Sequence, residues 1–247
     1  MKRIIAFVLT VMLIAAVFAG CGKEVVSSGT TEVTSKSESQ ANSTTANETV
    51  AYEAKSTEAL LSINDVPAQN LDAADADYQK KAPVAGEEVA ILHTSYGDIS
   101  FKFFPEVAPK AVTSFKALAK DGRYNSTIFH RIIDGFMIQG GDYTNYNGTG
   151  GESAFGEPFG LEISDYLTNI EGAVAMANTG QPNSNGSQFY INQVNNNSLD
   201  GNYTVFGQVY AGMDVVNQIA KVQTDPSNNK PLKDVVLESV EIKEYSE

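Results

Sequence analysis

The stretch FHRIIDGFMIQGGD, residues 129–142, contains two short apolar runs divided by an Asp-Gly pair. The first is part of a strand-like run over 127–133, and the second is a strand-like run over 136–139. On the second strand Met137 and Gln139 are two positions apart, so their side chains are expected to project to the same face. One face of this strand therefore carries both an apolar and a polar side chain.

Similar short runs continue on both sides of this stretch, separated by Gly, Asn and Asp. They cover 89–94, 99–104, 173–177, 188–192, 204–209 and 239–243. The first two flank Tyr96-Gly97-Asp98, a hairpin signature. Apolar residues recur at helical spacing over 108–120 and again over 213–222, which predicts two helices. Many short strands with two helices favour a closed antiparallel barrel or a sandwich whose open ends the helices cover.

Several other strings accompany residues 129–142 along the chain. They are NGTGG (147–151), MAN (176–178), NGSQFYI (185–191), and LDG (199–201) leading to VFG (205–207). In this order and spacing the strings resemble the cyclophilins, the peptidyl-prolyl cis/trans isomerases, over about 87–245. The resemblance implies a mainly β fold, a closed eight-stranded antiparallel barrel capped by two α-helices. It also implies an active groove on the outer face, since a barrel of this size is filled by its own side chains.

The resemblance further implies which side chains do the chemistry. Arg131 would be catalytic with Phe136 and Gln139, because a fixed donor aimed at the twisted amide nitrogen favours the transition state over both planar forms. Gln139 would support Arg131 and the turning carbonyl. The implied substrate-binding residues are Met137, Ala177, Asn178, Gln188, Tyr190, Leu199 and Tyr203, with the main chain of Ala177 and Asn178 anchoring an extended peptide.

Each of these assignments has a structural alternative. A lone Arg such as Arg131 is commonly a surface ion pair, and the apolar residues of the groove would otherwise be core. Phe189, on the opposite face from its neighbours, is assigned to the core. His130 is given a structural or supporting role because rotation about an amide removes no proton, and His93 matches no site residue of the family.

The chain departs from the family pattern at three positions. Tyr190 stands where many members have Phe, which would bring a hydroxyl into the proline pocket. Ser198 stands where cyclosporin-sensitive members have Trp, and Tyr203 where they often have His. Without the indole donor and its stacking surface, we expect activity on proline peptides with weak cyclosporin binding.

The N-terminus reads as an export signal followed by a spacer. Lys2 and Arg3 precede an apolar run and small residues over 1–20, too short for a comfortable membrane span. Cys21 follows FAG in what resembles a bacterial lipoprotein processing box; the alternative is an ordinary secretory signal. Residues 21–86 are rich in Ser, Thr, Glu and Asn, which predicts a flexible acidic linker, although 57–71 could form a transient helix or a docking motif.

Composition limits the remaining chemistry. The 247 residues include one Cys and two His, which argues against a zinc finger, a disulfide framework or a Cys-His nucleophile in the folded part. Nothing suggests a metal or other cofactor. The net charge of −13 argues against nucleic-acid binding. A domain over 87–247 is long enough for one sizeable core.

These observations support an isomerase, expected to be a monomer, that is lipid-anchored at Cys21 on the extracytoplasmic face of a bacterial cell membrane. Its partners would be proline-containing unfolded or exported proteins. The alternative is a non-catalytic chaperone or assembly factor that binds proline segments in the same groove. Arg131, Phe136 and Gln139 favour the enzyme, because a pure binder need not keep the donor. A tethered wall or adhesion protein is supported only by the linker.

Overall fold

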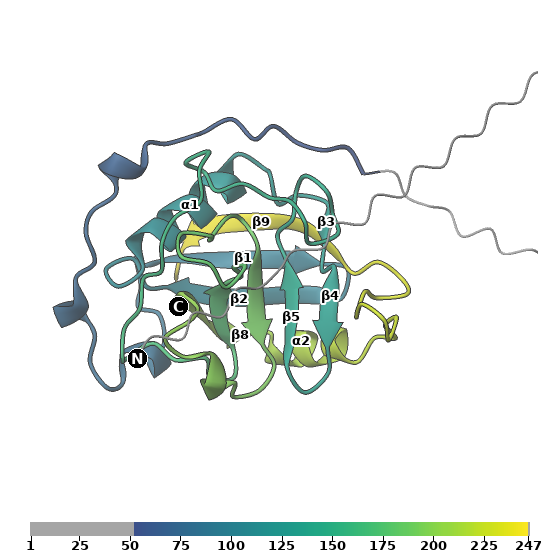
Figure 1. Ribbon diagram of the computed structural model, residues 1–247. Helices are drawn as coiled ribbons and strands as arrows, with labels where there is room; N and C mark the ends of the chain where they lie inside the picture. The colour runs from purple at the N-terminus through teal and green to yellow at the C-terminus, as the bar shows by residue number, and fades with distance from the viewer. Residues whose placement is uncertain (1–51, 247) are drawn as a thin grey trace, which may run out of the picture. The chain divides into compact units, whose positions relative to one another are not determined.

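The structure is a computed structural model that describes residues 52–246 (Figure 1). The expected signal segment 1–20, Cys21 and the spacer residues 22–51 lie outside the described residues, and their predictions stay predictions. Within residues 52–246, none of the helices has both the length and the apolar character needed to span a membrane.

Nine antiparallel strands form one sheet in the order β3-β9-β1-β2-β8-β6-β7-β5-β4. The strands are β1 (Glu88–Thr94), β2 (Gly97–Phe103), β3 (Thr127–Ile128), β4 (Arg131–Ile133), β5 (Met137–Gly140), β6 (Ala173–Met176), β7 (Phe189–Asn192), β8 (Val205–Ala211) and β9 (Val236–Glu244). The expected hairpin is β1 and β2, in which Thr94 lies opposite Gly97. Every run of residues predicted to be extended contains at least one strand.

The prediction of eight strands in a closed barrel is wrong in the count and in the closure. The run 127–133 is interrupted at Phe129 and His130, so that β3 pairs with β9 while β4 pairs with β5. β3 and β4 are therefore the two edges of a curled sheet, and they share no ladder of hydrogen bonds. Because only two residues separate them, the chain itself joins the two edges.

Alternate residues of the strands serve two separate hydrophobic clusters. Ile138 of β5 and Phe189 of β7 are fully buried in the larger cluster, and Phe189 thus lies in the core as predicted. Met137 and Tyr190, their neighbours in sequence, belong to the smaller cluster. Since successive side chains of a strand point to opposite faces, the smaller cluster lies on the outer face of the curled sheet. The residues of the predicted site are on this outer face.

Both predicted helices are present, as α1 (Pro109–Lys120) and α2 (Met213–Ala220). Each buries one face in the larger cluster, through Phe115 of α1 and Ile219 of α2 among others. Pro109 occupies the first turn of α1, where its missing N–H costs no hydrogen bond. The buried carboxylate of Glu162 accepts hydrogen bonds from two N–H groups of that turn, and so fixes α1 against the rest of the domain.

The segment 52–86, called the arm below, runs around the outside of the domain (Figure 1). It holds three short 3-10 helices, η1 (Ile63–Asp65), η2 (Leu71–Ala73) and η3 (Tyr78–Lys80). Leu60, Ile63 and Val66 pack against the larger cluster. The prediction of a flexible linker is therefore wrong over 52–86, because apolar contacts and hydrogen bonds dock this segment. Within 57–71, the contacts of Leu60, Ile63 and Val66 are with the chain's own domain.

Candidate active site

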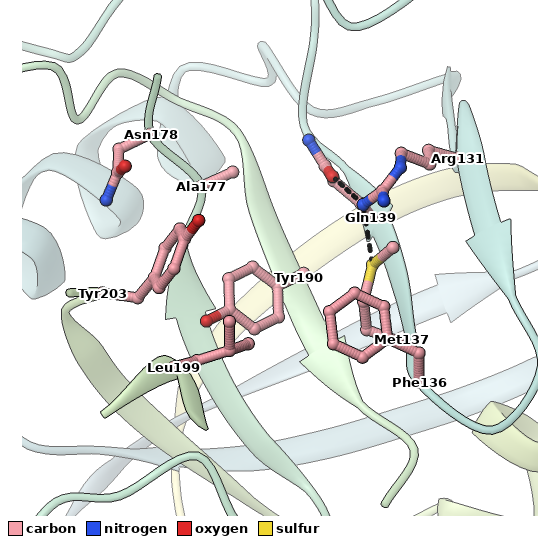
Figure 2. A pocket seen from close by; sticks show the side chains of 9 residues that line it. All are labelled: Arg131, Phe136, Met137, Gln139, Ala177, Asn178, Tyr190, Leu199 and Tyr203. Atoms are coloured by element: carbon pink, nitrogen blue, oxygen red, sulfur yellow. Dashed lines mark hydrogen bonds between the residues drawn. The ribbon is translucent and has the colours of Figure 1, made fainter. Parts of the chain in front are cut away.

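The predicted site residues, with the exception of Gln188, line one cavity of about 140 Å³, which we call the site cavity. Figure 2 shows their side chains around it. They come from β4, the turn before β5, β5 itself, β7, η4 (Asn197–Leu199), and the segments that follow β6 and η4. They are Arg131, Phe136, Met137, Gln139, Ala177, Asn178, Tyr190, Leu199 and Tyr203. The fold thus gathers residues from widely separated parts of the sequence at one place on its outer face.

Arg131 is held at the cavity by weak contacts only. Its Nη1 lies 3.4 Å from Oε1 of Gln139 and 3.9 Å from the sulfur of Met137, and its guanidinium carbon is 6.0 Å from the centre of the Phe136 ring. None of the ion pairs within residues 52–246 involves Arg131. The ion-pair alternative is therefore wrong for the described chain, and most of the five N–H donors of this guanidinium remain available to a ligand.

Gln139 links Arg131 to a second amide side chain. Its Oε1 faces Arg131, while its Nε2 donates to Oε1 of Gln188 at 3.0 Å. The Nε2 of Gln188 in turn donates to the carbonyl oxygens of Gly148 and Gly150, at 2.9 and 2.8 Å. Gln188 therefore positions Gln139 without lining the site cavity itself, and one N–H of Gln139 is left for a substrate carbonyl.

Tyr190 forms a wall of the cavity with its ring, and its hydroxyl is directed elsewhere. The hydroxyl donates to Oδ1 of Asn169 at 2.7 Å, and this contact is buried. Burial raises the pKa of Tyr190 above its ordinary value. The expectation that a hydroxyl enters the proline pocket is wrong, because the hydroxyl is turned toward Asn169, which accepts its hydrogen bond. The ring packs edge-on against Tyr203, with centres 5.7 Å apart.

A second cavity of about 350 Å³, which we call the side cavity, adjoins the site cavity. The two cavities share Gln139, Ala177 and Asn178 as lining residues. The N–H of Ala177 donates to the carbonyl oxygen of Gln188 at 2.9 Å and is thus engaged within the protein. The side-chain Nδ2 of Asn178 donates to the carbonyl oxygen of Asn202, which fixes the rim between the cavities.

The sequence profile of the family described as "Cyclophilin type peptidyl-prolyl cis-trans isomerase/CLD" matches residues 89–242. The chain belongs to the cyclophilin family. A protein of Staphylococcus saprophyticus named "Putative peptidyl-prolyl cis-trans isomerase" is 42% identical over 195 residues, covering 67% of this chain and 98% of that protein.

Solved cyclophilin structures share the fold. The crystal structure of a cyclophilin-type peptidyl-prolyl cis-trans isomerase from Cryptosporidium parvum is 36% identical and superposes with a TM-score of 0.62. That match covers 65% of this chain and 99% of the other. A second structure of the same protein, determined in the presence of the dipeptide Ala-Pro, gives 36% identity and a TM-score of 0.61, covering 64% of this chain and 99% of that one.

This cyclophilin also organises its site through Asp142, a residue to which the sequence analysis gave no role. The buried carboxylate accepts hydrogen bonds from the N–H groups of Thr144, Asn145, Asn147, Gly148 and Gly150. Burial raises its pKa, but these N–H donors outweigh burial and hold the pKa of Asp142 below its ordinary value. The Gly- and Asn-rich sequence after Asp142 was the available signal, since such a loop needs an internal acceptor.

His130 of this cyclophilin lies behind the same loop. Neither ring nitrogen has a hydrogen-bond partner within residues 52–246. A Cβ atom on Gly148 would come within 2.8 Å of the imidazole, so only glycine fits there, and its φ of 91° also favours glycine. Burial lowers the pKa of His130 to about 4. His130 is therefore a neutral packing residue beneath the loop, in line with the supporting role predicted for it.

Proposed function

We propose that this cyclophilin accelerates cis/trans isomerisation of X-Pro bonds in proteins outside the cytoplasmic membrane. The observation that carries the proposal is the guanidinium of Arg131, without an ion-pair partner among the described residues, at the edge of an apolar cavity. The cavity walls of Phe136, Met137 and Leu199 suit a proline ring. The relative determined with an Ala-Pro dipeptide supports the same substrate class.

The proposed mechanism needs no covalent step. Rotation about a peptide bond has a barrier of about 18–20 kcal/mol, because the C–N bond has partial double-bond character. In the twisted state the proline nitrogen becomes pyramidal and regains a lone pair, which a donor from Arg131 would stabilise more than either planar state. The cavity holds the ring while Gln139 donates to the turning carbonyl oxygen. A preorganised donor of this kind lowers the barrier without reorganisation.

The test follows cis-to-trans conversion of an Ala-Pro peptide by the full chain purified in detergent. Acceleration by the wild-type protein supports the enzyme. A folded chain that binds proline peptides without accelerating their conversion would overturn it in favour of the binding protein. Arg131→Ala is expected to lose the acceleration. Lys221→Ala, at the exposed C-cap of α2, is its control, because it removes a cation that lines neither cavity.

The second part of the proposal concerns location. We propose that Cys21 carries lipid and holds the protein on the outer face of a bacterial membrane, so that its clients are exported proteins. Its support is the sequence Lys2-Arg3, the apolar run and FAGC. A doubly acylated cysteine binds membranes stably, since each buried CH₂ contributes about 0.8 kcal/mol.

Fractionation of the producing bacterium tests the location. Wild-type protein is expected in the membrane fraction with a fatty-acid label, and Cys21→Ser is expected in the medium or soluble fraction without label. Retention of Cys21→Ser in the membrane would contradict the lipid anchor. Ser27→Ala, a change at a nearby polar position, controls for effects of altering the segment itself.

A further inference from the structure

The arm is in contact with the loop 142–156, which contributes several lining residues to the side cavity. Its first part, residues 52–61, lies against the loop 142–156. The hydroxyl of Tyr146 donates to the carbonyl oxygen of Glu53 at 2.9 Å, and the N–H groups of Leu60 and Leu61 donate to the carbonyl oxygen of Ala154 at 2.7 and 3.1 Å. The arm lies outside residues 89–242 that match the family profile.

Tyr146 of the loop is a strained residue that the arm contacts. It adopts a φ of 57°, in the left-handed region that bulky side chains rarely occupy. Its ring stacks on that of Tyr52 with centres 4.5 Å apart and an angle of 17°. Strain of this kind persists only where the surroundings hold it in place, and here the arm supplies both the stacking ring and the acceptor for the hydroxyl.

Further hydrogen bonds clamp the first part of the arm to the domain. The ammonium group of Lys55 donates to the carbonyl oxygens of Gly122 and Arg123 at 2.9 and 3.0 Å, and also to that of Asn125. The hydroxyl of Tyr52 donates to Asp234 at 2.8 Å. Two side chains, Tyr52 and Lys55, therefore make most of the side-chain contacts of this docking.

Other residues of the same loop line the side cavity. Gly148, Gly150 and Gly151 line the side cavity, and the carbonyl oxygens of the first two hold Gln188. Gln188 in turn holds Gln139, which contacts Arg131. A continuous series of contacts thus runs from the arm through the loop to the site cavity.

We propose that residues 52–61 are a positioning element of the active site: they hold the 142–156 loop in the conformation that shapes the side cavity. The inference rests on the proposed function. A glycine-rich loop has many alternative conformations, and one strained residue shifts such an equilibrium by roughly tenfold or more when its support is lost. Peptides long enough to reach the side cavity depend on the arm directly. Short Ala-Pro peptides that occupy only the site cavity depend on it through Gln188 and Gln139 alone, and are affected less.

The experiment compares three forms of the full chain in detergent: wild type, the double variant Tyr52→Ala/Lys55→Ala, and Gln69→Ala. Gln69 is the matched control, because its side chain docks the arm on the carbonyl oxygens of Val107 and Ile163, away from the loop. Hydrogen exchange of the Gly148 and Gly150 amides, and kcat and KM for a short and a long proline peptide, are measured for each form.

In the double variant we expect amide exchange in the loop to rise roughly tenfold and KM for the long peptide to rise severalfold. The kcat for the long peptide, and both kcat and KM for the short peptide, are expected to stay within about twofold of wild type. Gln69→Ala is expected to leave all of these values within about twofold of wild type. Unchanged loop exchange in the double variant overturns the proposal, and so do equal changes in Gln69→Ala, which would indicate general destabilisation. If the wild type shows no isomerase activity, the proposed function fails, while exchange and peptide binding still report on the arm.

Discussion

Two arginines of this cyclophilin lie in regions with opposite hydrogen-bonding character. Arg123, at the junction of the arm and the 142–156 loop, has a side chain only 3% exposed. It donates to Asp121 at 2.9 Å, to the carbonyl oxygen of Glu58 at 2.7 Å and to the hydroxyl of Tyr143 at 3.2 Å. Arg131, at the site cavity, makes only the long contacts to Gln139 and Met137.

The difference separates stability from function. A buried guanidinium is tolerated only when it is hydrogen-bonded, and each of the three nitrogens of Arg123 donates to a partner, as burial requires. Within residues 52–246, the N–H donors of Arg131 make only long contacts. They are therefore available to a ligand, such as a peptide whose proline nitrogen becomes an acceptor during rotation. Substitutions of residues in the two regions test this distinction, because each should change either the activity or the free energy of unfolding.

The largest effect is expected from Arg131→Ala. Loss of one positioned donor typically lowers kcat by about 100- to 1,000-fold. Because Arg131 makes no strong contact in the free protein, the free energy of unfolding is expected to change by less than about 0.5 kcal/mol. Conversion of an Ala-Pro peptide and urea unfolding measure the two quantities. Arg131→Lys, which keeps the charge but loses the planar donors, is expected to recover only part of the activity.

An Arg131→Ala protein with unchanged activity, or one that unfolds easily, would remove the distinction between the two arginines. In the first case the cavity binds proline without a catalytic donor. In the second case Arg131 has a structural role that its contacts do not explain.

The site region could be predicted closely from the sequence, for a physical reason. In a strand the side chains alternate, so once residues 136–139 are extended, Met137 and Gln139 must face one side and Ile138 the other. The outer-face placement of the site followed from the resemblance and this alternation together. What sequence could not supply was the direction of the Tyr190 hydroxyl, which depends on Asn169 from a separate loop.

The arm region could not be predicted from composition. Its polar residues are typical of a spacer, and its docking depends on main-chain hydrogen bonds such as Leu60 to Ala154 and Asn70 to Glu106, which leave no residue pattern. Likewise, the break between β3 and β4 at Phe129 and His130 falls inside 127–133, which carries no turn residue and reads as one strand. Both features result from long-range contacts that override local propensity.

The stability of the protein is expected to depend on pH through His130, whose ring packs against Gly148 and has no hydrogen-bond partner among the described residues. Its pKa falls from 6.5 to about 4 on folding, with burial as the main cause. As the pH falls, the imidazole of His130 is therefore protonated in the unfolded chain before it is protonated in the folded chain. The free energy of unfolding is unaffected by this group above pH 6.5 and decreases as the pH falls to about 4. The loss amounts to about 3 kcal/mol. Urea unfolding between pH 7 and pH 4 measures it.

His130→Gln is expected to abolish this part of the pH dependence. The neighbouring charges are Asp142, Arg131 and Lys230. Because the pKa of Asp142 is lowered from 3.8, most of the loss of its contribution falls below pH 4, and little of it falls in this window. His93→Gln, which changes the other imidazole, is the control. If that variant rather than His130→Gln removes the slope, the assignment to His130 is wrong.

A smaller effect is expected from Arg123→Met, which keeps an apolar stem and removes the guanidinium. The carbonyl of Glu58 and the hydroxyl of Tyr143 would lose a partner, at a cost of about 2 kcal/mol in the free energy of unfolding. Conversion of a short Ala-Pro peptide is expected to stay within about threefold of wild type, because the site cavity keeps its lining residues. Lys221→Met is the control for charge removal at the surface. Isomerase activity lost as in Arg131→Ala would contradict the division between the regions.

The smallest effect is expected from Tyr190→Phe, which tests the division within one side chain. The ring belongs to the site cavity, and the hydroxyl belongs to the buried contact with Asn169, which also accepts from Asn192 at 3.3 Å. Removing the hydroxyl should therefore lower the free energy of unfolding by about 1 kcal/mol and leave kcat/KM within about twofold. Tyr203→Phe, whose ring packs against Tyr190, is the matched control in the same cavity. If Tyr190→Phe changes peptide preference without changing stability, the hydroxyl acts on the substrate, and the division between paired and available donors fails at this residue.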